Sequence, residues 1–159
     1  MGKDQIIVKM LLDRWNASIE NCDKLLNSVS DEKLQSEIAP GKNRGIYLLG
    51  HLIAVHDSML TLLDMGEKKF PELAKAFLEE ADKVVTEIPS AKELRLKWNE
   101  QKEEMKQKFE SLTPDNWFER HTSVSEEDFA KEPHRNKLNI LLTRTTHLQY
   151  HIGQMVFLK

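Results

Sequence analysis

The sequence has a single cysteine, only five prolines and no long stretch in which polar and apolar residues alternate. With Cys22 alone, an internal disulfide and a cysteine-rich metal site are both excluded. The missing alternation indicates that β-strands are absent, and no internal repeat or low-complexity tract is visible. The amino terminus lacks the apolar run of a signal peptide, and no membrane-spanning helix is evident, so we expect a cytoplasmic protein.

A strong charge of one sign is also missing. The net charge is −3, from 23 basic and 26 acidic residues. This balance offers no basic surface for nucleic acid or for an anionic membrane, and we expect neither as a partner. At 159 residues, 40% of them hydrophobic, the chain is long enough for a sizeable core, and we treat residues 1–159 as a single domain.

Long amphipathic segments make up most of the chain. Residues 44–65 are apolar around most of their circumference, which is typical of a helix at the centre of a bundle. Residues 90–112 begin with a Ser-x-x-Glu capping box, and a last helix is predicted over residues 136–158. In residues 3–28, steps of three and four between apolar side chains predict a helix of about seven turns, with a stripe of Ile7, Met10, Leu11, Trp15, Ile19, Cys22, Leu25, Leu26 and Val29.

These four segments predict an all-α protein that folds as a four-helix bundle. We expect Gly66 to end the second helix, followed by a connection that contains a short helix from Pro71 to about Ala81. This connection is long enough to return along the bundle, so the predicted order is up-down-down-up. A second connection, over residues 114–135, has a possible short helix after Ser125.

Three of the six histidines form a candidate metal site. His147 and His151 are four residues apart, so they share one face of the last helix. His51 and His56 point about 140° apart on the second helix, so only one of them can face that pair. In antiparallel helices His51 lies at a matching depth, roughly 10 Å from its helix end. We therefore predict a site of His51, His147 and His151.

A site with three histidine ligands leaves at least one position of zinc or nickel open, which is the pattern of a catalytic site. The alternative is three unrelated histidines in the core or on the surface. Of the remaining histidines, His121 and His134 lie in a polar connection and are expected to be exposed.

Two stretches resemble the DinB/YfiT-like family. Residues 40–57, with Tyr47-Leu48-Leu49-Gly50-His51 and His56-Asp57, are similar to its second helix, and residues 146–154, with His-x-x-x-His-x-Gly-Gln, to its last. A weaker similarity lies at Trp15-Asn16. The resemblance spans nearly the whole chain and implies an up-down-down-up bundle, frequent homodimers and a divalent metal, often zinc or nickel, on His51, His147 and His151.

The activity that the resemblance implies is less specific. The family includes enzymes that depend on low-molecular-weight thiols, such as bacillithiol or mycothiol, metal-dependent hydrolases, and members without known activity. Our first hypothesis is an enzyme whose metal activates a thiol or water to attack a small substrate. The alternatives are a non-catalytic metal- or ligand-binding bundle, with a stress-related role as one option, and a helical interaction protein with incidental histidines.

Other chemically notable side chains have structural explanations. Cys22 lies on an apolar stripe, so we interpret it as an inert core thiol. Trp15 and Trp98 also lie on apolar stripes, and we favour a core position over a pocket for both. Tyr47 and Arg144 lie about one turn before His51 and His147. Both can face the metal site, where Arg144 would hold a carboxylate or thiolate, and a solvated Arg144 is the equal alternative.

Overall fold

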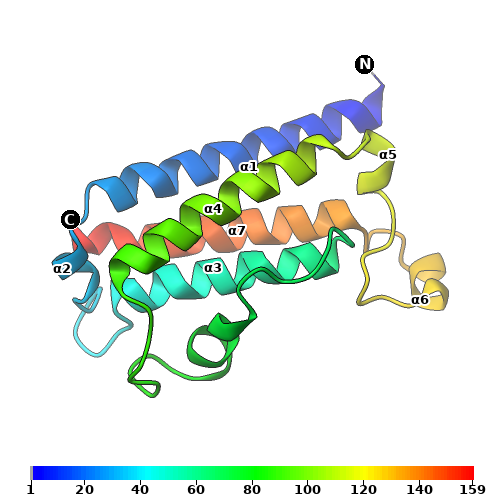
Figure 1. Ribbon diagram of the computed structural model, residues 1–159. Helices are drawn as coiled ribbons and strands as arrows, with labels where there is room; N and C mark the ends of the chain where they lie inside the picture. The colour runs from blue at the N-terminus through cyan, green and yellow to red at the C-terminus, as the bar shows by residue number, and fades with distance from the viewer. Residues whose placement is uncertain (1) are drawn as a thin grey trace.

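The structure is a computed structural model that describes residues 2–159 (Figure 1). Four long helices form it: α1 (Lys3–Asn27), α3 (Gly45–Leu62), α4 (Ala91–Glu110) and α7 (Lys137–Met155). Over the described residues no strand is present, which confirms the all-α prediction. Six short segments complete the chain: α2 (Asp31–Leu34), the 3₁₀ helix η1 (Pro71–Leu73), the π-helix η2 (Lys75–Glu79), α5 (Pro114–Trp117), α6 (Glu126–Lys131) and the 3₁₀ helix η3 (Val156–Leu158).

The long helices lie side by side as a bundle. In Figure 1, α3 and α4 run in one direction, and α1 and α7 run in the other. α1 packs along α7, and α3 packs against both α4 and α7. α1 and α4 approach each other mainly through side chains, such as Trp98 and Lys102 with Asp23. Of the four seams of the bundle, the one between α3 and α7 is therefore closer than the opposite one between α1 and α4.

Helix α1 covers nearly the predicted residues, but its buried stripe begins at Val8 and not at Ile7. Val8 and Trp15 are buried, whereas Ile7 and Met10 are 45% and 61% exposed. The two exposed residues were wrongly assigned to the core. The helix turns about 100° per residue, so a stripe that starts at Val8 leaves both of them on the outer face.

Helix α3 is buried on nearly all sides, as predicted for the central helix. By length and composition it would also suit a membrane span, which the sequence analysis did not anticipate, but 67% of it is buried inside the protein. The predicted stop at Gly66 is wrong. Asp64 adopts φ 57°, and the N–H of Met65 donates to the carbonyl of Leu60, so the left-handed residue of a Schellman ending is Asp64.

Capping residues define the other helix starts. The predicted box at Ser90 is present: its N–H donates to Glu93 Oε2 over 2.8 Å, and Glu93 N–H donates back to Ser90 Oγ. The predicted short helix after Ser125 is α6. Helix α5 was not predicted, although Thr113 caps it in the same way as Ser90 caps α4.

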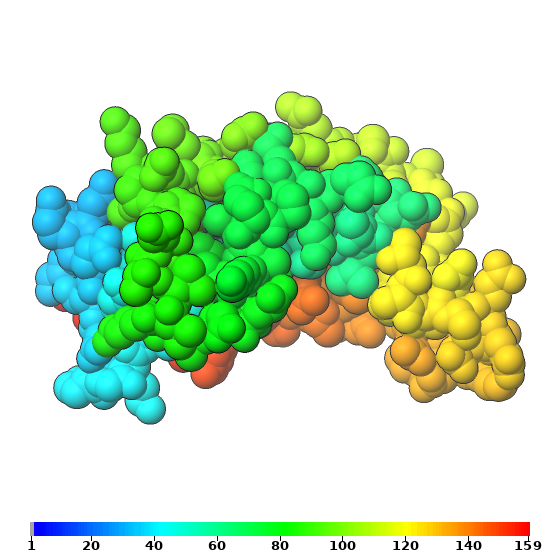
Figure 2. Space-filling view, turned by 60° about the horizontal axis from the view of Figure 1, so that its bottom comes forward, coloured from blue at the N-terminus to red at the C-terminus, as the bar shows by residue number. Residues whose placement is uncertain are grey.

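The connection between α3 and α4 packs against the bundle as a structured element. Figure 2 shows this segment, in teal to green, spread over one face of the molecule beside α7. Phe77 of η2 is fully buried against α3 at Gly50, where any Cβ would overlap its ring. Tyr47 donates from its hydroxyl to the carbonyl of Glu80, and Arg44 forms a 2.7 Å ion pair with Asp82. These contacts bring the backbone of η2 to the middle of α3.

Candidate metal centre

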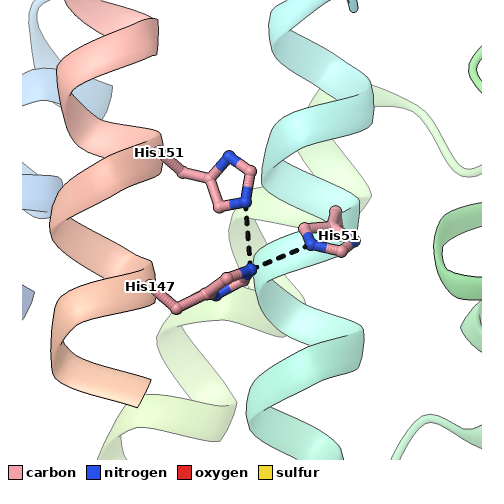
Figure 3. A group of neighbouring side chains, drawn as sticks. All are labelled: His51, His147 and His151. Atoms are coloured by element: carbon pink, nitrogen blue, oxygen red, sulfur yellow. Dashed lines mark hydrogen bonds between the residues drawn. The ribbon is translucent and has the colours of Figure 1, made fainter. Parts of the chain in front are cut away.

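The structure brings His51, His147 and His151 together in the seam between α3 and α7 (Figure 3). The Nε2 atom of His147 lies 3.2 Å from that of His51 and 3.0 Å from that of His151. One ring nitrogen from each residue lies within 4.8 Å of the other two. Tetrahedral zinc with bonds of about 2.0–2.1 Å places its ligand nitrogens about 3.3 Å apart, so the three side chains fit a single ion.

Hydrogen bonds at the other ring nitrogens orient two of these histidines. His51 Nδ1 lies 2.7 Å from the carbonyl oxygen of Phe77, and His151 Nδ1 lies 2.7 Å from Gln154 Oε1. A carbonyl oxygen only accepts, so each Nδ1 carries the hydrogen and each neutral ring presents a lone pair at Nε2. Such outer partners fix the tautomer and ring orientation of metal-binding histidines. The lone pairs of His51 and His151 therefore face the Nε2 atom of His147.

The surroundings keep the rings in the form that binds metal. Burial, followed by the charges of His151, His51 and Arg144, lowers the pKa of His147 to about 4. Burial also lowers the pKa of His151, against the opposing effect of its hydrogen bond to Gln154. At neutral pH both side chains are therefore uncharged, and no proton competes with a metal ion for them.

The other histidines lie away from this group. His56 is 1% exposed and faces the opposite side of α3, where its ring lies 4.9 Å from Trp15 and 5.6 Å from Trp98. His134 is exposed, as predicted. His121 is buried at 7% exposure, so its predicted exposure is wrong: the next residue, Thr122, donates its N–H to the carbonyl of Leu62 and holds this connection against the end of α3.

Two neighbouring side chains were predicted to face the site. The ring of Tyr47 is stacked on that of His51, with ring centres 6.3 Å apart. Arg144 is half-buried, its Nε has no hydrogen-bond partner in the protein, and burial lowers its pKa. The charge of Arg144 lowers the pKa of His147, so the guanidinium lies within electrostatic reach of the site. The Nε atom of Arg144 is therefore buried, and the predicted alternative of a solvated Arg144 is wrong for this atom.

The groups that hold the rings in place were not predicted. The carbonyl of Phe77 belongs to a backbone, which leaves no residue-type signal, and it is 26 positions from His51. Gln154 had a local signal, because it lies three residues after His151 on the same helix face. Cys22 is fully buried, and burial with the charge of Asp23 raises the pKa of its thiol to about 12, as fits an inert core residue.

Comparison with known proteins agrees with this geometry. No curated protein matches the chain. The sequence model of the DinB superfamily matches residues 14–155, a range that includes all three clustered histidines. Because this match covers most of the chain, the protein belongs to the DinB superfamily.

Proposed function

We propose that the protein is an enzyme that binds a divalent metal ion, zinc or nickel, through His51, His147 and His151. The observation that carries the proposal is the convergence of the three Nε2 atoms at distances suited to one ion. When bound, such an ion lowers the pKa of a thiol or water and so supplies a nucleophile at neutral pH. The substrate is then a small electrophile, and a low-molecular-weight thiol is the proposed second reactant.

The chain's own residues prepare the site for this role. The Phe77 carbonyl and Gln154 hold two of the rings in the metal-binding tautomer before any ion arrives. Three protein ligands leave room for a thiol or water, unlike a closed structural site with four. Arg144 offers an unpartnered guanidinium N–H near His147, and it would hold a carboxylate or other anionic group of the reactants.

The proposal also includes the direction of the four long helices, the oligomeric state and the location in the cell. An up-down-down-up order is supported by the course of the four long helices in Figure 1. In that order α3 and α7 are antiparallel neighbours, which is why His51 meets a pair near the end of α7. A homodimer and a cytoplasmic location stay predictions.

The test combines metal analysis with an assay of turnover. The parent, loaded with zinc or nickel, is mixed with a low-molecular-weight thiol and 1-chloro-2,4-dinitrobenzene, and thioether formation is followed. We expect one metal ion per chain and turnover in the parent. His51→Ala should lose both, and His134→Ala, which changes an exposed histidine, should lose neither. Metal binding without turnover of the thiol or of ester substrates would favour the non-catalytic alternative.

A further inference from the structure

A cavity lies across α3 from the histidine cluster, in the loose seam between α1 and α4. Its volume is about 280 Å³, and none of the three clustered histidines lines it. The hydrogen bonds of Trp98 and Lys102 to Asp23 bridge the two helices at this cavity. Pockets for small molecules commonly measure about 300–1,000 Å³, so this one suits a ligand at the small end of that range.

Aromatic rings and one imidazole form the deep part of the cavity. Trp15, Trp98 and His56 all line it, and their exposures are 3%, 2% and 1%. The ring of His56 packs against both indoles, with its centre 4.9 Å from that of Trp15 and 5.6 Å from that of Trp98. Offset or tilted packing against such rings favours a flat aromatic ligand.

His56 brings an unused polar atom to the aromatic part of this cavity. Its Nε2 is buried and has no hydrogen-bond partner within the protein. A buried polar atom without a partner costs about 1–3 kcal/mol, so nearly all such atoms in native proteins are satisfied. Burial, and then the charges of His147, Arg144, His51 and His151, lowers the pKa of the His56 ring to about 3. The imidazole is therefore neutral and can form one hydrogen bond to an uncharged group.

The charges around the cavity favour no charged ligand. Asp23 is already committed to the Trp98 indole N–H and to the ammonium of Lys102. The side chains nearer the surface carry both signs, among them Glu20 and Lys106. Opposite charges at one rim largely cancel, so they do not select an anion or a cation.

We propose that this cavity is a second ligand site, which binds an uncharged aromatic molecule of one or two fused rings with a single hydrogen-bonding group, such as an indole or a phenol. The rings of Trp15 and Trp98 pack against the ligand, and Nε2 of His56 satisfies its polar group. The site lies across α3 from the histidine cluster. It therefore binds its ligand without the metal, and it does not depend on the proposed enzymatic function.

The first test uses the tryptophan side chains as reporters. Indole is titrated into ¹⁵N-labelled protein, and the three tryptophan Nε1–H signals are followed by NMR. We expect saturable shifts for Trp15 and Trp98. The signal of Trp117, which packs on Phe109 outside the cavity, should move far less. No saturable shift up to about 10 mM indole, or equal shifts of all three signals, would overturn the proposal, because a site with a Kd of about 1 mM would be nearly saturated at that concentration.

Two further ligands and a metal control test the chemistry. Indene has the shape of indole without its N–H, and it should bind about fivefold more weakly, the value of one hydrogen bond. His56→Phe keeps a ring but removes the nitrogen, so it should abolish this preference for indole. Zinc should leave the indole affinity unchanged within about twofold. Equal affinity for indole and indene in the parent, or displacement of indole by zinc, would contradict the proposal.

A matched pair of surface variants tests the location. Asn16 is exposed on α1 and lines the cavity, so Asn16→Phe should fill its mouth and weaken indole binding roughly tenfold or more. Asn21→Phe makes the same change on an exposed part of α1 that does not line the cavity, and it should bind indole as the parent does. If both variants bind equally well, the ligand lies elsewhere. This pair decides the location even if His56→Phe does not fold.

Discussion

The two histidines of α3 lie five residues apart and occupy opposite seams of the bundle. In the α3–α7 seam, His51 is oriented by a carbonyl and meets two more imidazoles. In the α1–α4 seam, His56 is enclosed by indoles and its Nε2 has no partner. The same residue type is thus a candidate metal ligand in one seam and an isolated neutral polar group in the other. The difference comes from what packs against each ring, and not from the helix that carries both.

The largest expected effect is the loss of metal on His151→Ala. Removing one of three ligands should abolish binding, while the bundle stays folded because its core does not depend on the ion. Metal should raise the melting temperature of the parent alone, because a free metal concentration of 100 times Kd adds about 3 kcal/mol to the stability of the folded state. Metal analysis and circular dichroism measure these effects, with His134→Ala as the control. If His151→Ala is unfolded, the metal ion has a structural role. If His151→Ala keeps its full metal content, the three histidines are not the metal ligands.

Acid should release the metal ion from the site between α3 and α7. Histidine binds metal only when neutral, so metal affinity should fall as the pH drops below about 6. The lowered pKa of His147, about 4, delays proton competition at that ring, so release should be complete only near pH 4. Metal content after dialysis at each pH measures this. Constant metal content down to about pH 4 would contradict an all-imidazole site.

The substitution Gly50→Ala should disturb the site between α3 and α7, although it changes none of the three histidines. The new Cβ of Gly50→Ala overlaps the ring of Phe77, and η2 must shift together with the carbonyl that orients His51. We expect about 1–3 kcal/mol of destabilisation from overpacking. We also expect metal affinity to be about 10–100-fold weaker from the lost outer hydrogen bond. Denaturant unfolding and calorimetric metal titration measure the two effects.

Gly153 provides the matched control for that variant. It lies in α7 beside the histidine pair, and a Cβ there has no neighbour within 4 Å. Gly153→Ala should therefore keep the metal affinity and stabilise the helix by about 0.5–1 kcal/mol. If both substitutions behave alike, the contact between Gly50 and Phe77 does not position His51.

The last effect is confined to acid pH and concerns the α1–α4 seam. The pKa of His56 is lowered in the folded protein, to about 3 from an ordinary 6.5, so the unfolded state binds more protons below pH 6.5. This contribution to stability is complete above pH 6.5 and is lost progressively as the pH falls toward 3. His56→Leu should remove roughly 2–2.5 kcal/mol of the decrease in unfolding free energy between pH 6 and pH 4.

The measurement is denaturant unfolding at several pH values. His134→Leu serves as the control, since that histidine is exposed in the folded protein. Identical pH profiles for the parent and His56→Leu would show that His56 titrates normally, and that its surroundings are not as closed as the packing of Trp15 and Trp98 implies.

Local patterns in the sequence were enough for several features. Helical phase placed His147 and His151 on one face of α7, and Ser90 with Glu93 marked the start of α4. Both are interactions within one or two helical turns, so neighbouring residues decide them. The choice of His51 over His56 also came from phase and depth along helices.

Tertiary packing decided the rest. The orientation of His51 depends on the carbonyl of Phe77, which reaches α3 only because Gly50 leaves room for its ring. The burial of His121 follows from a connection that binds back to the end of α3. The cavity beside His56 lies between α1 and α4, where Trp15 contacts Phe109 of α4 and Trp98 donates to Asp23 of α1. Each of these features joins residues that are distant in the chain, and the energy of such contacts depends on a packing geometry that no local pattern encodes.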